Sequence, residues 1–463
     1  MSNLKKGIVT VFIANMINMV LSVLTSFVLP KYLSVETYSY IKTYQLYVSM
    51  LGILHLGYID GMFLKYGGVD LDKLNYKDVD KNISTFRLFQ VFVTALTFLC
   101  IVLFVHDYVY VVVALVILPV NLTAYYKSFF QSIGEFKRYS RLMNATTGIT
   151  FLANFILLLC IKSDDYRLYI SMYLLINLFI WVALEYLFRK ICKYKFHYFY
   201  FSVQELVANI KDGILLMLGN FANTILTSLD RWFVKALLTT VDFAHYSFAC
   251  SMETMINVAV TPITVTLYNY FCKNPGKERI ILVRNAITVV ASYLIACAFP
   301  AKFILEVYLT KYIESSKILF YLFAAQLFYI IIKSIYVNLY KAMHMQKKYF
   351  IKLIIVIISG FLLNIICFMA IHTKEAFAIG TLVSAFIWYI LCIFDFKYYG
   401  THATDIIYMF VNLSAFLICG YLFEAVVGCL IYLIILTGSS MVLMRREMKF
   451  LTDYIYSMLP SNT

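Results

Sequence analysis

Charged residues are scarce in this chain of 463 residues. Asp, Glu, Lys and Arg make up 14% of it, while 62% of the residues are hydrophobic and the mean hydropathy is +0.81. A soluble globular protein carries about 25% charged residues, so the composition excludes a water-soluble domain, and the hydrophobicity excludes a disordered chain. The length alone would suit about three soluble domains, but the composition predicts an all-α polytopic membrane protein instead.

Several motifs of catalysis and metal binding are also missing. The sequence has neither a GxxxxGK[ST] phosphate-binding loop nor an HExxH zinc motif, and its ten cysteines form no CxxC pair. These absences argue against an ATPase, a zinc enzyme and a disulfide scaffold, and we expect no cofactor, no metal site and no enzymatic activity. The acidic pair Asp164-Asp165, which a metal-dependent glycosyltransferase could use, is interpreted as surface charge. No cleavable signal peptide is expected, because the first apolar segment is too long and lacks a cleavage site.

Long apolar segments predict the transmembrane helices, since one span needs about 20 apolar residues. The loops between them are short, and the longest, 65–83 and 189–211, leave no room for a soluble domain. Little more than Glu424 separates the last two segments, which could instead form a re-entrant hairpin. The fourteen predicted spans are 8–30, 41–64, 84–106, 109–126, 142–161, 168–188, 212–236, 244–270, 285–306, 316–339, 350–371, 376–396, 405–423 and 425–444.

Lysine and arginine are distributed unevenly around these spans. With the N-terminus in the cytoplasm, 28 of the 39 basic residues fall in segments predicted to be cytoplasmic, eight on the opposite side and three inside spans. The positive-inside rule therefore predicts that both termini are cytoplasmic. The net charge of +14 is then explained by topology and by contact with anionic lipid headgroups rather than by nucleic acid binding.

The first and seventh spans carry a matching pattern of polar residues. The helical spacing of these residues predicts polar stripes that line a wet cavity, although such stripes can also simply join helices. A repeat of six spans keeps the orientation of the copies, so we expect two parallel lobes related by an axis along the membrane normal. At shifts of 205 to 208 residues the aligned pairs are Asn15 with Asn220, Asn18 with Asn223, Ser22 with Thr227, Thr25 with Asp230, Ser26 with Arg231 and Gln45 with Glu253. The predicted organisation is a six-helix lobe at 1–190, a cytoplasmic linker at 191–211, a second six-helix lobe at 212–397, and two extra helices with a tail at 398–463.

Two cations lie close together in the seventh span. A charge at mid-membrane costs at least about 2.5–3.5 kcal/mol and is functional by default. Arg231 and Lys235 are four residues apart on one helix face, where like charges repel. An anion bound between them would relieve this repulsion; alternatively, both side chains and Asp230 snorkel to the external surface.

Other polar residues lie within the later spans. Lys333 shares a helix face with Gln326, seven residues earlier, and Glu253 is expected to pair with one of the cations. The acidic residues near predicted cytoplasmic ends are interpreted structurally, Asp60 and Asp395 as helix caps and Glu185 as a snorkelling side chain.

Three segments resemble a known family of membrane proteins. Residues 29–39 (LPKYLSVETYS), 57–61 (GYIDG) and 229–235 (LDRWFVK) are similar to segments of bacterial polysaccharide-biosynthesis flippases, the Wzx-like exporters of O-antigen repeat units. These belong to the multidrug/oligosaccharidyl-lipid/polysaccharide exporter superfamily. The resemblance extends along the whole chain in span number and loop size.

The resemblance implies an undecaprenyl-pyrophosphate-linked oligosaccharide, of O-antigen or capsular type, as the substrate. The protein would turn it from the inner to the outer leaflet of the bacterial inner membrane by alternating access, together with polymerase and chain-length partners. Without a nucleotide site, the driving force would be an ion gradient or consumption of the product. The predicted substrate-binding residues are Asn15, Asn18, Ser22, Gln45, Asn220, Asn223, Thr227, Asp230, Arg231, Lys235, Glu253, Gln326 and Lys333.

Three other functions fit the sequence less well. A multidrug-type cation antiporter of the same superfamily would need a carboxylate in the cavity of the first lobe, where the first span offers only neutral side chains. A membrane polysaccharide polymerase or ligase would present a large external loop. A flippase for another lipid-linked cargo, such as a peptidoglycan precursor or teichoic acid, remains compatible with the same residues.

The unequal distribution of basic residues generates a topological prediction. Cysteine labelling or a reporter fusion at Arg445-Arg446 should report a cytoplasmic location. External labelling there would show that the number of spans is wrong, most simply at the final pair.

Overall fold

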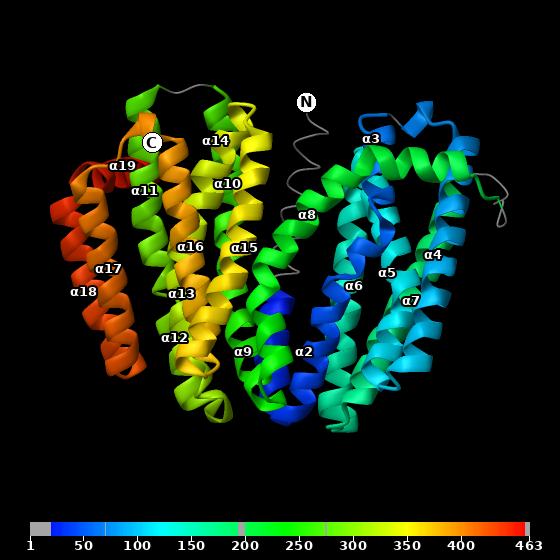
Figure 1. Ribbon diagram of the computed structural model, residues 1–463, viewed down its shortest axis with the longest axis horizontal. Helices are drawn as coiled ribbons and strands as arrows, with labels where there is room; N and C mark the ends of the chain where they lie inside the picture. The colour runs from blue at the N-terminus through cyan, green and yellow to red at the C-terminus, as the bar shows by residue number, and fades with distance from the viewer. Residues whose placement is uncertain (1–19, 70, 193–199, 274–275, 459–463) are drawn as a thin grey trace, which may run out of the picture. The chain divides into compact units, whose positions relative to one another are not determined.

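The computed structural model describes residues 20–69, 71–192, 200–273 and 276–458. These residues form helices joined by short loops, and no strand occurs among them (Figure 1). In this part of the chain, ten helices are long and apolar enough to cross a membrane, and two bent helix pairs raise the number to twelve. The prediction of an all-α polytopic membrane protein is therefore confirmed.

Fourteen spans were predicted, and the two that are not among these twelve are the first and the seventh. The described part of the first is a short apolar helix at Val20–Tyr32. The seventh lies within α8 (Val203–Leu237), which the ten helices and two pairs do not include. Residues 203–211 were expected in the linker but are helical, because the Ser202 hydroxyl caps the helix by accepting the Glu205 N–H at 3.3 Å. The last two predicted spans are separate helices, each long and apolar enough to cross a membrane alone.

The chain divides into two units, Met1–Ile225 and Leu226–Thr463, with α8 contributing to both. In the first unit α5 occupies the centre and packs against α2, α3, α4, α6 and α7. The elements are α2 (Val35–Ser49), η1 (Leu51–His55), α3 (Tyr58–Tyr66), η2 (Leu71–Lys73), α4 (Tyr76–Phe104), α5 (Tyr108–Ser132), α6 (Phe136–Phe155), η3 (Ile156–Ile161), α7 (Tyr166–Cys192) and the amino-terminal part of α8.

In the second unit the central helix is α13, which packs against α9, α11, α12, α16 and α17. Almost every residue of α13 is buried, which explains why its sequence is apolar on all faces. The elements are α9 (Thr240–Thr254), α10 (Ile256–Cys272), α11 (Lys277–Ile295), α12 (Ala298–Val307), η4 (Thr310–Tyr312), α13 (Ser315–Ile331), η5 (Ile332–Tyr336), α14 (Val337–Ala342), α15 (Gln346–Ile371), α16 (Glu375–Asp395), η6 (Lys397–Tyr399), α17 (Ala403–Leu422), α18 (Ala425–Leu443) and α19 (Arg445–Met458).

Among the residues that the structure describes, each unit contains one sharply bent helix pair. In the first unit the axis turns by 61° between η1 and α3, where Leu56 and Gly57 adopt the left-handed conformation. In the second unit it turns by 48° between α9 and α10, and Pro262 lies in the following turn. The proline ring clashes with the carbonyl four residues earlier, at Val258, which favours a bend there. Both pairs correspond to the second span of a predicted lobe, which agrees with a parallel repeat.

Helix α3 touches α8 through backbone atoms within the first unit. In Figure 1 the first turns of α8 run across the ends of helices of this unit, beside α3. A Cβ added to Gly61 would lie 2.0 Å from the Asn209 carbonyl oxygen, and one added to Gly213 would lie 2.0 Å from the Gly57 carbonyl oxygen. A Cβ at Gly57 would likewise lie 2.6 Å from the Ile214 backbone nitrogen, so both glycines of the GYIDG segment are explained by helix packing.

Cations of the span formed by α11 and α12 hold α17, the first of the two extra helices. At one end the Arg284 guanidinium pairs with Asp405 at 3.0 Å, and both side chains are buried. At the other end the buried Lys302 ammonium donates to the carbonyls of Gly420 at 2.9 Å and Phe423 at 2.6 Å. A cation at the carboxyl end of a helix binds carbonyls that lack intrahelical partners, so Lys302 caps α17.

The contact between α3 and α8 generates a prediction of stability. Gly213→Ala should destabilise the protein by about 1–3 kcal/mol, because the new Cβ overlaps backbone that has to move. The matched control is Gly219→Ala on the same helix, where a Cβ would meet nothing within 4 Å and where alanine should stabilise by about 0.5–1 kcal/mol. Thermal unfolding of the purified proteins in detergent measures both, and equal midpoints for the two variants would contradict the backbone contact.

Candidate functional site

Asp230 joins three helices of the second unit. Its carboxylate on α8 is buried and accepts the Tyr246 hydroxyl of α9 at 2.7 Å and the Thr381 hydroxyl of α16 at 3.5 Å. The Arg231 N–H also donates to it, at 2.8 Å. A buried carboxylate needs such donors, so Asp230 is an integral part of this packing and does not snorkel to the surface.

The two cations that follow Asp230 are held differently. The half-buried Arg231 guanidinium donates to the Thr227 carbonyl at 3.3 Å, and no carboxylate oxygen of the described residues lies within 4.0 Å of it. The Lys235 ammonium lies 5.4 Å from the centre of the Phe243 ring, in a cation–π contact. The structure thus places a partly desolvated guanidinium on the residue that follows the buried Asp230.

A second polar group links α13 and η5 to the bent pair of α9 and α10. The Gln326 amide donates to the Glu253 carboxylate, and the Lys333 ammonium lies 3.5 Å from the Asn257 amide oxygen. Glu253 was expected to pair with a cation, but its direct partner is the neutral Gln326, while the charges of Lys333 and Arg231 act on it from further away. Gln326 and Lys333 therefore share a helix face, as their spacing predicted.

Lys333 lies within a π-helical turn. Such turns occur often at functional sites, and η5 here spans Ile332–Tyr336. Beside it, the hydroxyls of Thr264 and Ser334 are 3.1 Å apart, and the Asn338 amide donates to the Thr264 carbonyl at 2.7 Å. These polar contacts of α10 were not predicted from the sequence. Pro262 was a usable sequence signal for the bend between α9 and α10. The π-helical turn has no such signal, because no residue type is specific to it.

The predicted site residues of the first unit are mostly exposed. Ser22, Gln45, Asn220 and Asn223 have exposed side chains, as does Thr227 on the second-unit part of α8. Within this unit the Asn220 amide donates to Asp60 in the first turn of α3 at 3.4 Å, so Asp60 joins α3 to α8, whereas the residue at the cap of α3 is Gly57. Two further predicted residues, Asn15 and Asn18, lie outside the described residues.

Two acidic groups near helix ends are structural ion pairs. Glu185 was interpreted as a snorkelling side chain, but this is wrong, because it lies in the interior of the first unit, bound by Arg87 at 2.5 Å and by the Tyr126 hydroxyl. At the end of α16, Asp395 binds Lys348 at 3.2 Å and Lys352 at 3.3 Å. Each carboxylate joins neighbouring helices, and neither belongs to the candidate site.

An ionic cluster lies at the predicted external end of the second unit. The Lys374 ammonium is 2.5 Å from Glu314, 3.1 Å from Asp242 and 3.1 Å from the His245 Nδ1 atom. Glu314 lies in the loop before α13, and the Lys374 ammonium holds the pKa of its carboxyl below the ordinary value. The cluster fixes the loops that precede α13 and α16 to the start of α9.

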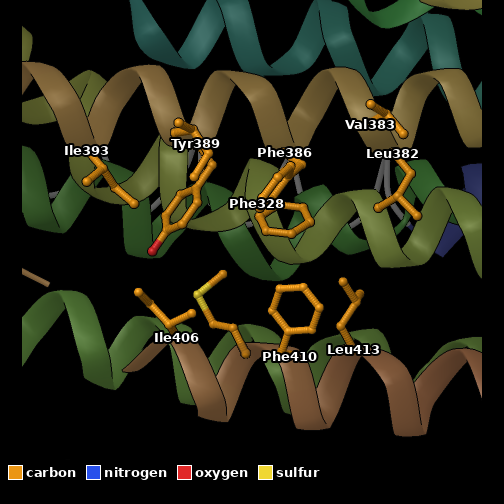
Figure 2. Close-up of a pocket in the computed structure, with 11 residues that line it drawn as sticks. Phe328, Leu382, Val383, Phe386, Tyr389, Ile393, Ile406, Phe410 and Leu413 are labelled. Carbon is orange, nitrogen blue, oxygen red and sulfur yellow. The ribbon is translucent and has the colours of Figure 1, made fainter. Parts of the chain in front are cut away.

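An apolar pocket of about 290 Å³ lies between α13, α16 and α17. Figure 2 shows Ile406, Phe410 and Leu413 of α17 facing Leu382 and Phe386 of α16 across it. Almost none of the side chains that line it can form a hydrogen bond. The pocket therefore suits a hydrocarbon chain rather than a polar ligand. Among the described residues of this unit, the polar group around Asp230, Arg231, Glu253 and Lys333 is the stronger candidate site.

Comparisons with known proteins inform the fold. No protein-family model and no curated protein matches this sequence. Among solved structures, the inward closed conformation of the lipid II flippase MurJ matches with a TM-score of 0.59 and 15% identity, covering 95% of this chain and 99% of that one. The two folds are similar.

Weaker structural matches are also found. A transporter of the MOP superfamily from Pyrococcus furiosus has a TM-score of 0.46 and 14% identity, and an outward-facing MATE multidrug transporter of that superfamily has 0.42 and 13%. Each covers 86% of this chain and 97% of the other. At these scores the two matches add nothing to the likeness with MurJ.

The bonds to Asp230 generate a prediction of stability. Tyr246→Phe removes a donor from a buried carboxylate and should cost about 1–3 kcal/mol. Tyr186→Phe on α7 is the matched control, because the Tyr186 side chain is 66% exposed and the change should be nearly neutral. Unfolding midpoints in detergent measure the difference, and a neutral Tyr246→Phe would mean that Asp230 is satisfied without this bond.

Proposed function

We propose that this protein is a flippase for a polyprenyl-pyrophosphate-linked oligosaccharide, of O-antigen or capsular type, in the bacterial cytoplasmic membrane. One observation carries the proposal. Arg231 and Lys333 lie within helices of one unit, and neither has a carboxylate oxygen within 4.0 Å among the described residues. Cations in such surroundings attract an anion, and the pyrophosphate is the anionic part of this substrate.

The chemistry of the neighbouring side chains supports the same substrate class. A guanidinium binds phosphate oxygens in bidentate geometry, whereas an ammonium acts as a point charge. Gln326 and Asn257 add neutral amides beside Lys333, which suit sugar hydroxyls or phosphate esters. Asp230, the residue before Arg231, offsets part of the guanidinium charge while the site is empty.

The fold is compatible with this function. The similar structure is that of a protein named as a lipid II flippase, and an all-α protein of many spans can move a lipid-linked cargo by alternating exposure of a site near the membrane centre. The polar stripe of α8, on which the side chains of Asn220, Asn223 and Thr227 are exposed, would then line the pathway. Polymerase and chain-length proteins of the same pathway are the expected partners.

Substitution of the cations tests the proposal. Arg231→Ala, Lys235→Ala and Lys333→Ala should abolish or strongly reduce glycan export, and Arg231→Lys should recover only part of it because the bidentate geometry is lost. The measurement is surface glycan per unit of membrane-inserted protein in cells that depend on this chain. Ser26→Ala is the control, since it removes a neutral hydroxyl and leaves no charge unpaired. Normal export by all three alanine variants would refute the anion site.

A matched pair of carboxylate variants separates this function from cation antiport. Because the first span offers no carboxylate, a cation antiporter built from this chain would have to use Asp230 and Glu253 of the second unit, and it would tolerate loss of Arg231 and Lys333. Glu253→Gln should retain measurable glycan export on our proposal, because Gln326 can still hydrogen-bond the amide that replaces the carboxylate. Loss of drug or cation efflux in Glu253→Gln, with full efflux in Arg231→Ala, would favour the antiporter.

A further inference from the structure

A groove of about 780 Å³ lies between α10, α11 and α19 of the second unit. Its walls are apolar along most of their length, and the amphipathic helix α19 closes one side with Phe450 and Leu451. An amphipathic helix that follows a transmembrane span typically lies in the membrane interface. On α11 the lining runs from Arg279 through Leu282 to Val290, and on α10 it runs from Pro262 to Tyr270.

Positive charge gathers at one end of this groove. Arg279 lines its mouth with an exposed side chain, and no carboxylate of the described residues lies within 4.0 Å of its guanidinium. Lys277 is exposed two residues away, and Lys449 is exposed on α19. Two of the nearby acids have partners of their own, since Glu278 faces Arg446 at 4.0 Å and the buried Glu447 accepts the Asn285 amide at 3.3 Å, while Asp453 is exposed further along α19.

The length of the groove matches one leaflet of a bilayer. From Arg279 to Val290 the chain advances by eleven residues of α11, which at 1.5 Å per residue is about 16 Å. The hydrocarbon core of a bilayer is about 30 Å thick, so the groove extends from the interface to near the midplane. The pocket in Figure 2 has a similar apolar lining but no cation at its mouth.

We propose that this groove binds one anionic glycerophospholipid of the inner leaflet. One acyl chain lies between α10 and α11, and the phosphate lies at the Arg279 guanidinium, with Lys277 and Lys449 adding positive potential. The positive charge at the mouth selects a lipid with an anionic headgroup. Helix α19 forms the third wall of the groove and covers the acyl chain. This binding site is separate from the proposed transport function and does not depend on it.

Native mass spectrometry of the purified full chain in detergent tests the proposal. Titration with phosphatidylglycerol should give one saturable high-affinity lipid, and phosphatidylcholine of the same acyl composition should bind more weakly. Arg279→Ala should weaken phosphatidylglycerol binding about fivefold, as expected for one basic residue near an anionic headgroup. Leu282→Trp should fill the groove and abolish the site, with the unfolding midpoint measured to show that the variant is folded.

Lys341→Ala is the matched control. Lys341 is an exposed cation near the end of α14, also predicted to be cytoplasmic, and its loss should leave the affinity unchanged. Equal affinity for the two lipids, or equal loss in Arg279→Ala and Lys341→Ala, would refute headgroup selection at this mouth. Undiminished binding by a folded Leu282→Trp would place the lipid elsewhere, and retention of polyprenyl phosphate in preference to phosphatidylglycerol would refute the phospholipid as occupant.

Discussion

A polar group inside a membrane must find its partner within the protein, because hydrocarbon cannot replace it. In the described part of this chain that constraint determines which helices touch. Asp230 is held by hydroxyls from α9 and α16, Gln326 holds Glu253, and Glu185 is held by Arg87 and Tyr126. Each of these contacts fixes how a helix is rotated about its own axis. Packing between apolar side chains alone would specify that rotation only loosely.

The same constraint separates structural charges from functional ones. Arg284 and Lys302 have carboxylate or carbonyl partners at close range, so their charges are fully used in holding helices together. Arg231 and Lys333 make only long or neutral contacts in the same unit. A cation whose desolvation is only partly compensated still attracts an anion. Arg231 and Lys333 are therefore the candidate site because of their incomplete pairing, and not only because they lie inside the membrane.

Span positions and helix content could be predicted from the sequence, because twenty apolar residues bounded by polar loops have few alternatives in a membrane. Partner choice could not, since it depends on contacts between residues far apart in the chain. Glu185, for example, is an isolated acid near a helix end in the sequence, and its partner Arg87 lies 98 residues earlier. The π-turn at Lys333 escaped prediction for a different reason, as its hydrogen-bond register is set by packing and no residue type specifies it. Local signals did exist for the bends, in the glycine at position 57 and the proline at position 262.

The cations at the two ends of the span formed by α11 and α12 also constrain how the protein is made. Arg284 finds Asp405 only 121 residues later in the chain, and Lys302 finds the Gly420 carbonyl 118 residues later. During synthesis, this span therefore enters the membrane before α17 exists to neutralise it. Until α17 arrives, Arg284 has only the neutral Asn285 amide of its own helix and no carboxylate, while Lys302 has Glu306 one turn along at 3.7 Å but lacks the carbonyls that complete its bonding. The last two helices are thus not an appendage to a finished bundle, because their insertion completes the electrostatics of a span made much earlier.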